Sequence, residues 1–246
     1  MTEGMSQAVA RVSRVDSEQF GCRVGRATGV EEGGVPELIE WCADHRVRLL
    51  VARSRQIRAV QALEARDFKL MDVLVYYQFP LVEKPIPSQS STAQVRPCRT
   101  EDHETIAGIA LESFKDYRGH YHNDARLPRE KCDEGYADWA RNSCLETGSA
   151  QEVLVAEVHG RVVAFATVSL REHGVAEGRL GAVSPEARRQ GLYRRLLLAR
   201  MEWSRDRGAR KFVTSTQINN YATQKVWQRV GLEIFDSVYT LHGWFD

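Results

Sequence analysis

The sequence predicts a mixed α/β protein, and three observations support that prediction. Segments with the apolar pattern of strands alternate with segments of helical periodicity along the chain. A stretch over 79–94, rich in proline, serine and threonine, divides the chain into a shorter N-terminal and a longer C-terminal part. In the longer part, a strand is followed by a loop with arginine and glycine and then by a helix, which is the layout of an anion site.

The N-terminal part is predicted to alternate strands and helices. Pro36 lies where a proline favours the first turn of a helix, because its missing N–H would have no partner there. The helix that it starts carries Leu38, Ile39 and Trp41. The strands are expected at 20–27, 47–52 and 71–77, and the second helix at 57–65.

The C-terminal part is predicted to continue this alternation. Asp102 is expected to cap a helix, since its carboxylate can accept the unpaired N–H groups of a first turn. His159-Gly160 is expected to form the turn of a β-hairpin. The strands are expected at 95–99, 153–158, 162–170, 177–183, 211–216 and 234–241, and the helices at 104–114, 130–142, 192–205 and 221–229.

The sequence also predicts two domains. Trp41 and Val51 match Trp203 and Val213 at one constant offset, so the first domain is interpreted as a partial copy of the second. The expected division is a small N-terminal α/β domain over 1–80, a linker over 81–94 and the larger domain over 95–246.

The composition limits the kind of protein. A formal net charge of +1 speaks against binding to nucleic acid or to an anionic membrane, since both need a basic excess. The five cysteines form neither a C-x-x-C pair nor a zinc spacing with histidine, so we expect reduced thiols, no metal and a cytoplasmic location. The sequence has no long apolar run, so we expect neither a signal peptide nor a membrane span.

The segment that follows Val183 carries the chemistry. A strand is expected to end there, followed by a polar turn, the run Arg188-Arg189-Gln190-Gly191 and a helix. The first N–H groups of a helix have no partner within it and attract anions, and arginines add charge-assisted hydrogen bonds to phosphate. In the repeat, the first domain has Glu31-Glu32 near the position that corresponds to this arginine run. Because paired carboxylates repel phosphate, we expect the first domain to lack a cofactor loop.

This segment resembles the cofactor loop of the GNAT acetyltransferases, Arg/Gln-x-x-Gly-x-Gly/Ala followed by a helix. Here it runs Arg188-x-x-Gly191-x-Tyr193, where Tyr193 departs from the small residue of the family. The first strand and helix of the longer part, its hairpin, and the run from Asn220 to Leu232 match further motifs of the family in the same order. The resemblance implies the GNAT fold, a mixed and mostly antiparallel sheet with splayed central strands.

The resemblance also implies acetyl-CoA as cosubstrate, without a metal. In the family, the thioester lies between the splayed strands, and the backbone of one strand pairs with the pantetheine amides. The residues that would hold the cosubstrate are Ala182, Val183, Arg188, Arg189, Gln190, Gly191, Leu192, Tyr193, Arg194, Asn220 and Trp227.

In the family, an amine attacks the thioester directly, which requires a base for the ammonium proton and can use an acid for the leaving thiolate. Glu177 matches the base by its place on the strand before the loop. Trp227 replaces the usual tyrosine acid, and an indole N–H cannot act as an acid at neutral pH. Either the thiolate leaves into solvent or another residue acts, and the candidates are Tyr239, Tyr221, Tyr193 and His242.

The polar and aromatic segment over 117–126 is predicted to bind the acceptor, because in the GNAT fold this region covers it. Its side chains suit a polyhydroxyl or base-containing ligand. The alternative is a solvated loop whose aromatic residues pack on Trp139. The candidate acceptor residues are Tyr117, His120, Tyr121, His122 and Asp124.

The chain is similar to the TDP-fucosamine (TDP-4-amino-4,6-dideoxygalactose) N-acetyltransferase branch, where a small α/β domain precedes a GNAT domain. The run from Asp16 to Arg26 resembles the opening strand region of that branch, and the ending from Tyr239 to Trp244 fits it. The resemblance implies a small-molecule partner, the amine of a nucleotide-linked sugar. The last strand of this fold could also pair across a homodimer.

Other functions stay open on the sequence alone. A GNAT could act on another small amine or on a protein N-terminus. An aminoacyl transferase that uses charged tRNA is disfavoured by the near-neutral charge. A non-catalytic module that binds CoA or a sugar nucleotide fits the replacement at Trp227.

Overall fold

The computed structural model describes residues 9–88, 93–115, 117–145 and 148–245 of the chain. The chain divides into two compact units, each built from separate stretches of sequence. Unit 1 comprises Met1–Val75, Arg118–Cys132 and Ser237–Asp246, and unit 2 comprises Tyr76–Tyr117 and Asp133–Asp236. This division differs from the domain limits expected from the sequence, because residues 118–132 and 237–246 pack with the N-terminal stretch.

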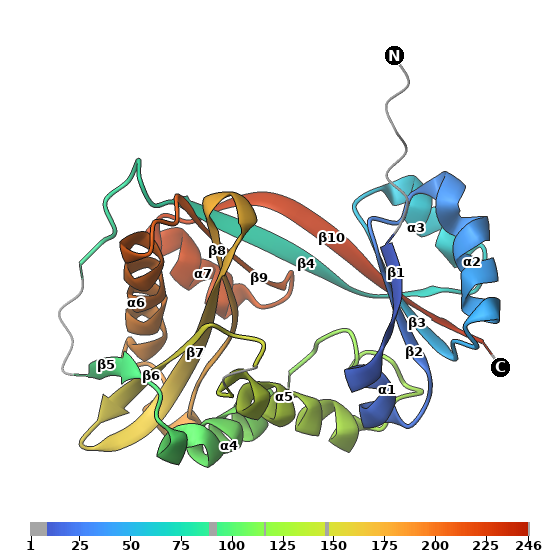
Figure 1. Ribbon diagram of the computed structural model, residues 1–246. Coiled ribbons are helices and arrows are strands. Elements are labelled where there is room, and N and C mark those ends of the chain that lie inside the picture. Colours follow the sequence, from blue (N-terminus) through green and yellow to red (C-terminus); the bar gives the residue numbers. More distant parts are fainter. Residues whose placement is uncertain (1–8, 89–92, 116, 146–147, 246) are drawn as a thin grey trace. The chain divides into compact units, whose positions relative to one another are not determined.

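Figure 1 labels the helices and strands in chain order. The strands are β1 (Val9–Ser13), β2 (Val24–Thr28), β3 (Leu49–Ser54), β4 (Lys69–Pro80), β5 (Gln94–Pro97), β6 (Glu152–Val158), β7 (Arg161–Arg171), β8 (Val175–Val183), β9 (Lys211–Gln217) and β10 (Glu233–Trp244). The helices are α1 (Arg14–Phe20), α2 (Val35–Asp44), α3 (Ile57–Glu64), α4 (His103–Phe114), α5 (Arg129–Ser143), α6 (Leu192–Asp206) and α7 (Tyr221–Val230). Among the described residues, no helix combines the length and the apolar character needed to cross a membrane.

Unit 1 contains a sheet with the strand order β1-β2-β3-β10. β2 and β3 run parallel and stay paired to the end of β2, where Thr28 lies opposite Arg53. β10 pairs with β3 in the antiparallel sense, so that Thr240 lies opposite Arg53 and His242 opposite Val51. Since directly opposite residues point to the same side, Thr28, Arg53 and Thr240 form a row on one face.

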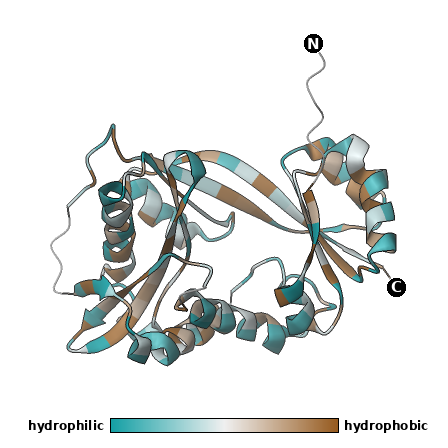
Figure 2. Ribbon diagram, in the orientation of Figure 1, coloured by the Kyte–Doolittle hydropathy of each residue, from teal (hydrophilic) through white to brown (hydrophobic). Residues whose placement is uncertain are grey.

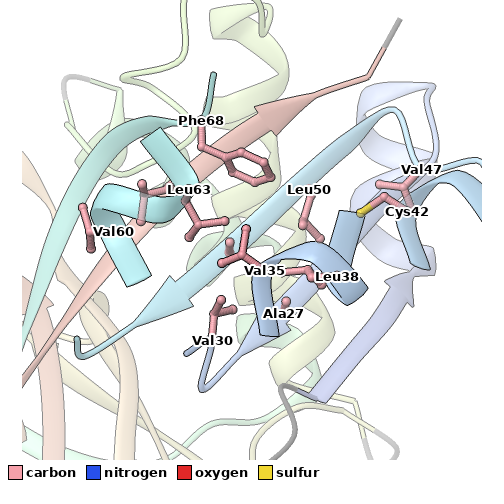
Figure 3. Close-up of a cluster of buried hydrophobic side chains, with 12 residues drawn as sticks. Ala27, Val30, Val35, Leu38, Cys42, Val47, Leu50, Val60, Leu63 and Phe68 are labelled. Carbon is pink, nitrogen blue, oxygen red and sulfur yellow. The ribbon is translucent and has the colours of Figure 1, made fainter. Parts of the chain in front are cut away.

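One face of this sheet is covered by α2 and α3. Figure 3 shows how apolar side chains of both helices meet those of the strands. α2 has a proline in its first turn, as the sequence predicted from Pro36. The buried cluster consists of Ala27, Val30, Val35, Leu38, Cys42, Val47, Leu50, Ala52, Val60, Leu63, Phe68 and Leu241.

The opposite face of the unit 1 sheet is covered by α1 and by residues 118–132. A second buried cluster lies there, consisting of Phe20, Val24, Leu49, Val51, Leu127 and Cys132. Tyr121 and Trp244 pack against it. The segment predicted to bind the acceptor is therefore also part of the apolar cover of this sheet.

The strand expected at 20–27 is present as β2, but it is shorter, and helix α1 ends at the first residue of the expected range. Ser13 caps the helix by accepting from the Asp16 N–H, and Gly21 ends it at φ 68°, a left-handed conformation that glycine adopts without strain. The strand then begins only at Val24. β1 and α1 have no counterpart in the prediction, since charged residues interrupt their apolar pattern.

Unit 2 contains the strand order β4-β9-β8-β7-β6-β5, in which β5 to β8 pair in the antiparallel sense and β8 runs parallel to β9. Apolar residues of α4 and α5 cover one face, and those of α6 cover the other. β7 is coloured mainly hydrophobic in Figure 2, as expected for a strand buried on both faces. The mixed and mostly antiparallel sheet confirms the predicted fold class.

Most predicted elements of the C-terminal part are confirmed, with differences at their ends. His159 and Gly160 have φ 50° and 74°, which is the tight turn expected between β6 and β7. Asp102 is the N-cap residue of α4, as the sequence predicted, but its side chain makes no cap bond to that helix. The carboxylate instead accepts from the Arg99 N–H at 2.7 Å and from Arg96 Nη1 at 2.6 Å. The expected linker lies partly outside the described residues.

The order of elements also repeats along the chain. β2-α2-β3-α3-β4 has the same order as β8-α6-β9-α7-β10, and the first two strands of each set are parallel. The sequence match of Trp41 to Trp203 joins α2 to α6, and that of Val51 to Val213 joins β3 to β9. The repeat agrees with the interpretation of the N-terminal part as a partial copy.

Candidate active site

Strands β8 and β9 separate part-way along their length. Pairing joins Val175 to Lys211 and ends where Gly178 meets Thr214. Within the described residues, β8 continues to Val183 and β9 to Gln217 with no further pair between them. This is the splay expected from the family resemblance, and an extended ligand could pair with the strand edge that it opens.

Gly178 marks the point of separation. A Cβ atom there would lie 2.6 Å from Nη1 of Arg200 and 2.8 Å from the Phe212 ring, so no larger residue fits without a shift. Arg200 of α6 is 2% exposed, and burial lowers the pKa of its guanidinium. Arg200 is not among the site residues predicted from the sequence, because an arginine on an amphipathic helix ordinarily faces solvent.

The loop between β8 and α6 is the candidate phosphate cradle. Arg188, Arg189, Gln190 and Gly191 are exposed, and Arg189 and Gly191 have φ 65° and 76°. Gly191 is the N-cap of α6, and no side chain of the described residues caps this helix. The loop therefore places two exposed arginines at the start of a helix, an arrangement that binds anions.

The remaining residues predicted around the loop lie on the same two elements. Ala182 and Leu192 are buried in the two cores of unit 2, so only their main-chain groups could contact a ligand. Tyr193 and Arg194 are half-buried in the first turn of α6. The Val183 carbonyl accepts from the Ser113 hydroxyl at 3.1 Å, a contact that the sequence did not reveal.

The two predicted residues of α7 have clear structural roles. Asn220 accepts from the Thr223 N–H at 3.4 Å and donates to Thr216 at 2.9 Å, so it caps the helix that follows β9. Trp227 is 2% exposed, and its ring meets that of Tyr77 edge-on at 5.1 Å. Its indole N–H is buried with no hydrogen-bond partner among the described residues.

Glu177 faces the side of the unit 2 sheet that α4 and α5 cover. Gly178 faces Arg200 of α6, and successive residues of a strand point to opposite faces. The Glu177 carboxylate accepts from Arg171 at 2.8 Å, and Nε of Arg179 lies 3.9 Å away. With 26% of its side chain exposed, this carboxylate is accessible from solvent.

A chain of hydrogen bonds links buried polar residues of unit 1. Asp124 Oδ2 accepts from His242 Nδ1 at 2.7 Å and from Trp244 Nε1 at 2.9 Å. His120 Nδ1 lies 2.9 Å from His242 Nε2. Because Nδ1–H of His242 donates to the carboxylate, Nε2 of the neutral ring is the acceptor, and His120 donates to it from Nδ1.

The surroundings of these hydrogen-bonded residues set their charges. Burial lowers the pKa of His120 well below its usual value, and the positive charges around it act in the same direction. Burial alone would raise the pKa of Asp124, but hydrogen bonds, first of all that from His242, outweigh it and lower the pKa. At neutral pH, therefore, His120 is neutral and Asp124 is ionised.

The predicted acceptor residues divide between the units. His120, Tyr121, His122 and Asp124 belong to unit 1, whereas Tyr117 belongs to unit 2. His120 and Asp124 are only 8% and 4% exposed, so the alternative of a solvated loop is wrong for them. The Tyr117 hydroxyl donates to Gln217 at the end of β9, where β8 and β9 are already apart.

The two predicted catalytic residues also belong to different units, Glu177 to unit 2 and Tyr239 to unit 1. The Tyr239 ring packs against the cluster under α2 and α3. His242, one of its alternatives, donates to Asp124 on the opposite face of the same strand. No contact described here tests the assignment of the acid, which stays a prediction.

A comparison with known families decides the class of the protein. Residues 104–232 match the family model described as the acetyltransferase (GNAT) family. The matched range runs from α4 to the end of α7 and includes both the opening between β8 and β9 and the loop before α6. The chain belongs to the GNAT family. GNAT enzymes transfer an acetyl group from acetyl-CoA, and the exposed arginines beside the helix start at the α6 loop fit a pyrophosphate.

Individual proteins share sequence or fold with this chain. The spore coat polysaccharide biosynthesis protein SpsD of Bacillus subtilis is 26% identical over 151 residues, which are 61% of this chain and 50% of that protein. The chain thus spans about half the length of this curated relative. A GCN5-related N-acetyltransferase from Sphaerobacter thermophilus has a TM-score of 0.65 at 14% identity, covering 96% of this chain and 76% of its own. A tandem GNAT protein from the clavulanic acid biosynthesis pathway has a TM-score of 0.61 at 14% identity, covering 91% and 76%.

One group of residues in this GNAT protein could hold a metal ion. The ligand atoms of Cys98, His103 and Cys144 all lie within 4.8 Å of one another. Two thiolates and an imidazole are ligands that zinc accepts, although a closed structural site has four. The sequence spacing did not reveal this group, because Cys144 comes from a different stretch of unit 2 than Cys98 and His103.

Proposed function

We propose that this GNAT protein acetylates the amino group of a nucleotide-linked amino sugar of the TDP-4-amino-4,6-dideoxyhexose type. Acetyl-CoA is the cosubstrate, and no metal takes part. The observation that carries the transferase assignment is the opening between β8 and β9 next to the arginine-bearing start of α6. It combines a strand edge for an extended thioester arm with a cradle for its phosphates.

On the donor side, the chain contributes charge and main-chain groups. Arg188 and Arg189 offset the charge of a pyrophosphate, and Gly191 lets the backbone turn toward it. The strand edge beyond Gly178 pairs with amides of the pantetheine arm, and a main-chain N–H polarises the thioester carbonyl. Acetyl-CoA supplies an activated acyl group.

On the catalytic side, Glu177 is the proposed base. Its carboxylate takes a proton from the acceptor ammonium, which leaves a neutral amine able to attack the thioester carbonyl carbon. A C–N bond forms as the C–S bond breaks and the CoA thiolate leaves. The acylated nitrogen then releases its extra proton to solvent, which leaves a neutral amide. The buried indole of Trp227 cannot protonate that thiolate, so Tyr239 or solvent water supplies the proton.

On the acceptor side, two observations support a sugar. The printed name of the relative SpsD concerns polysaccharide biosynthesis, although this chain spans only part of that protein. The segment over 117–126 carries donors and aromatic faces suited to sugar hydroxyls or a base, and His122 and Tyr121 in it are half-buried.

The test follows free-thiol release from acetyl-CoA with a panel of amines. The panel contains TDP-4-amino-4,6-dideoxyhexoses, free amino sugars, aminoglycosides, polyamines and peptides. Selective turnover of the nucleotide-linked amino sugars is expected. Turnover of another amine would keep the transferase assignment and discard the sugar acceptor, whereas CoA binding without any turnover would indicate a non-catalytic module.

A further inference from the structure

The face of the unit 1 sheet that carries His242 also carries a row of polar side chains. Arg53 of β3 lies between Thr28 of β2 and Thr240 of β10 in the strand register. The row lies at the carboxyl ends of the parallel strands β2 and β3, which is where open α/β sheets commonly bind ligands. Along this row, Thr28 is exposed, Arg53 is half-buried and Thr240 is buried.

Two buried atoms of the row have no hydrogen-bond partner among the described residues. They are Nε of Arg53 and Oγ1 of Thr240, and Thr240 is 0% exposed. Buried donors are nearly always paired in native proteins, because an unpaired one loses its hydration without compensation. One ligand with several acceptor oxygens would satisfy both the N–H and the O–H.

Arg53 is a positive charge in the row whose guanidinium has no carboxylate partner among the described residues. Arg53 and Arg26 both lie close enough to His120 for their charges to add to the effect of burial on its pKa. Arg26 is neutralised by Asp16, whose two oxygens accept at 2.5 and 2.8 Å. The row therefore favours an anion, and a guanidinium pairs best with a planar or multi-oxygen group such as phosphate.

We propose that Arg53 and Thr240 bind a phosphate group of the acceptor, which makes unit 1 the nucleotide-recognition unit of the enzyme. The identity of the ligand, a nucleoside diphosphate attached to an amino sugar, rests on the proposed function. Arg53 donates to one phosphate oxygen and the Thr240 hydroxyl to another. This site is separate from the cradle at α6, which lies in unit 2.

Calorimetric titration of thymidine diphosphate into protein saturated with CoA tests the site. CoA occupies the cradle at α6, so a second phosphate ligand has to bind elsewhere, and no acyl group is present for turnover. Arg53→Gln is expected to weaken binding about tenfold or more, as for the loss of a hydrogen bond to a charged group. Arg58→Gln changes an exposed arginine of α3 in the same unit and is expected to leave the affinity unchanged.

Thr240→Val is the second variant, since it keeps the shape of the side chain and removes a hydroxyl that has no protein partner. It should fold as the wild type does and bind the diphosphate several-fold more weakly. Equal affinity of Arg53→Gln, Thr240→Val and wild type, or no binding of the diphosphate to the wild type, would overturn the site.

Titrations with inorganic pyrophosphate and with thymidine identify the source of the phosphate. Arg53-dependent binding of thymidine diphosphate that exceeds that of pyrophosphate points to the nucleotide of the acceptor. Equal Arg53-dependent binding of pyrophosphate supports a phosphate site but assigns it to free phosphate. If the nucleotide sugar is turned over with a KM that Arg53→Gln does not change, the proposed phosphate site is wrong and the proposed function stands. Arg53-dependent nucleotide binding without turnover of any amine would keep the site and remove the function.

Discussion

His120 and Asp124 show how a polar pair can be both buried and stable. The carboxylate of Asp124 stays ionised because it receives hydrogen bonds from His242 and Trp244, and His242 in turn orients His120. Removing one member of such a buried network leaves the others unpaired, which costs more than the bond itself contributes. This hydrogen-bond network therefore fixes the segment over 118–132 on the unit 1 sheet.

The lowered pKa of His120 predicts a loss of stability in mild acid. The unfolded chain takes up a proton on this residue below about pH 6.5, whereas the folded protein does not until the pH reaches its lower pKa. The contribution is thus fully present above about pH 6.5 and is lost as the pH falls toward the folded pKa, by up to about 1.4 kcal/mol per pH unit.

Urea unfolding at about pH 7.5 and about pH 5.5 measures this effect. His120→Asn keeps a donor near the position of Nδ1 but does not titrate, so it should lose less stability between the two pH values than the wild type. His173→Asn is the control, because His173 is 92% exposed and its left-handed φ of 59° suits asparagine. An unchanged pH dependence in His120→Asn would show that the imidazole is not buried in its neutral form.

Glu177 leads to a prediction about the reaction. At low pH the acceptor arrives as an ammonium ion, so removal of the base should matter most there. Glu177→Gln is expected to lower kcat about a hundredfold at low pH and by a smaller factor at high pH. The control is Glu172→Gln, a change at a side chain that is 95% exposed. A ratio of wild-type to variant kcat that is constant with pH would exclude Glu177 as the base.

The polarity of single residues was readable in the sequence, but their partners were not. The segment over 117–126 was found because histidines, tyrosines and an aspartate gather there, yet His120 and Asp124 proved to be buried against β10. Arg53 was not predicted as a site residue, because a charged residue after an apolar run is typical of the end of a strand. Its importance arises from the strand register that brings Thr240 beside it.

The helix that starts at Leu192 shows which parts of the fold could be predicted. Periodicity defined α6, α7 and the hairpin of β6 and β7 closely, because long apolar patterns and a turn with positive φ leave few alternatives. The short helix α1 was missed, since its start depends on a serine cap and its end on Gly21 rather than on an apolar stripe. The point where β8 leaves β9 depends on Gly178 and Arg200, a contact between distant residues that no local pattern shows.

Gly191 allows a test of the cradle at α6. Gly191→Glu introduces a negative charge and a side chain at φ 76°, so we expect acetyl-CoA binding to be lost, while the strain of about 1–2 kcal/mol leaves the protein folded. Gly208→Glu is the matched control, since Gly208 has φ 81°, lies beyond the other end of the same helix and has open space around it. Calorimetry with acetyl-CoA should find unchanged affinity in the control. Unchanged affinity in Gly191→Glu as well would remove the cradle from the cosubstrate site.

The division into units changes what the N-terminal stretch can do alone. The sequence favoured an independent domain over 1–80, because a proline-rich linker follows it and its elements resemble a partial copy of the larger part. In the structure, unit 1 also needs residues 118–132 and 237–246. Local periodicity predicts that β10 is a strand, but it cannot predict that this strand pairs with β3.

We therefore predict that a fragment of residues 1–80 does not fold. Without β10, the edge of β3 from Leu49 to Ser54 loses its partner, and without residues 118–132 the apolar face with Val24 and Val51 loses its cover. Circular dichroism and amide hydrogen exchange should find no cooperative unfolding transition and little protection in the fragment. The full chain should show protected amides in β2 and β3 under the same conditions. A fragment with a cooperative transition and native-like protection in these strands would show that the cover and the last strand are dispensable, and it would restore the domain boundary expected from the sequence.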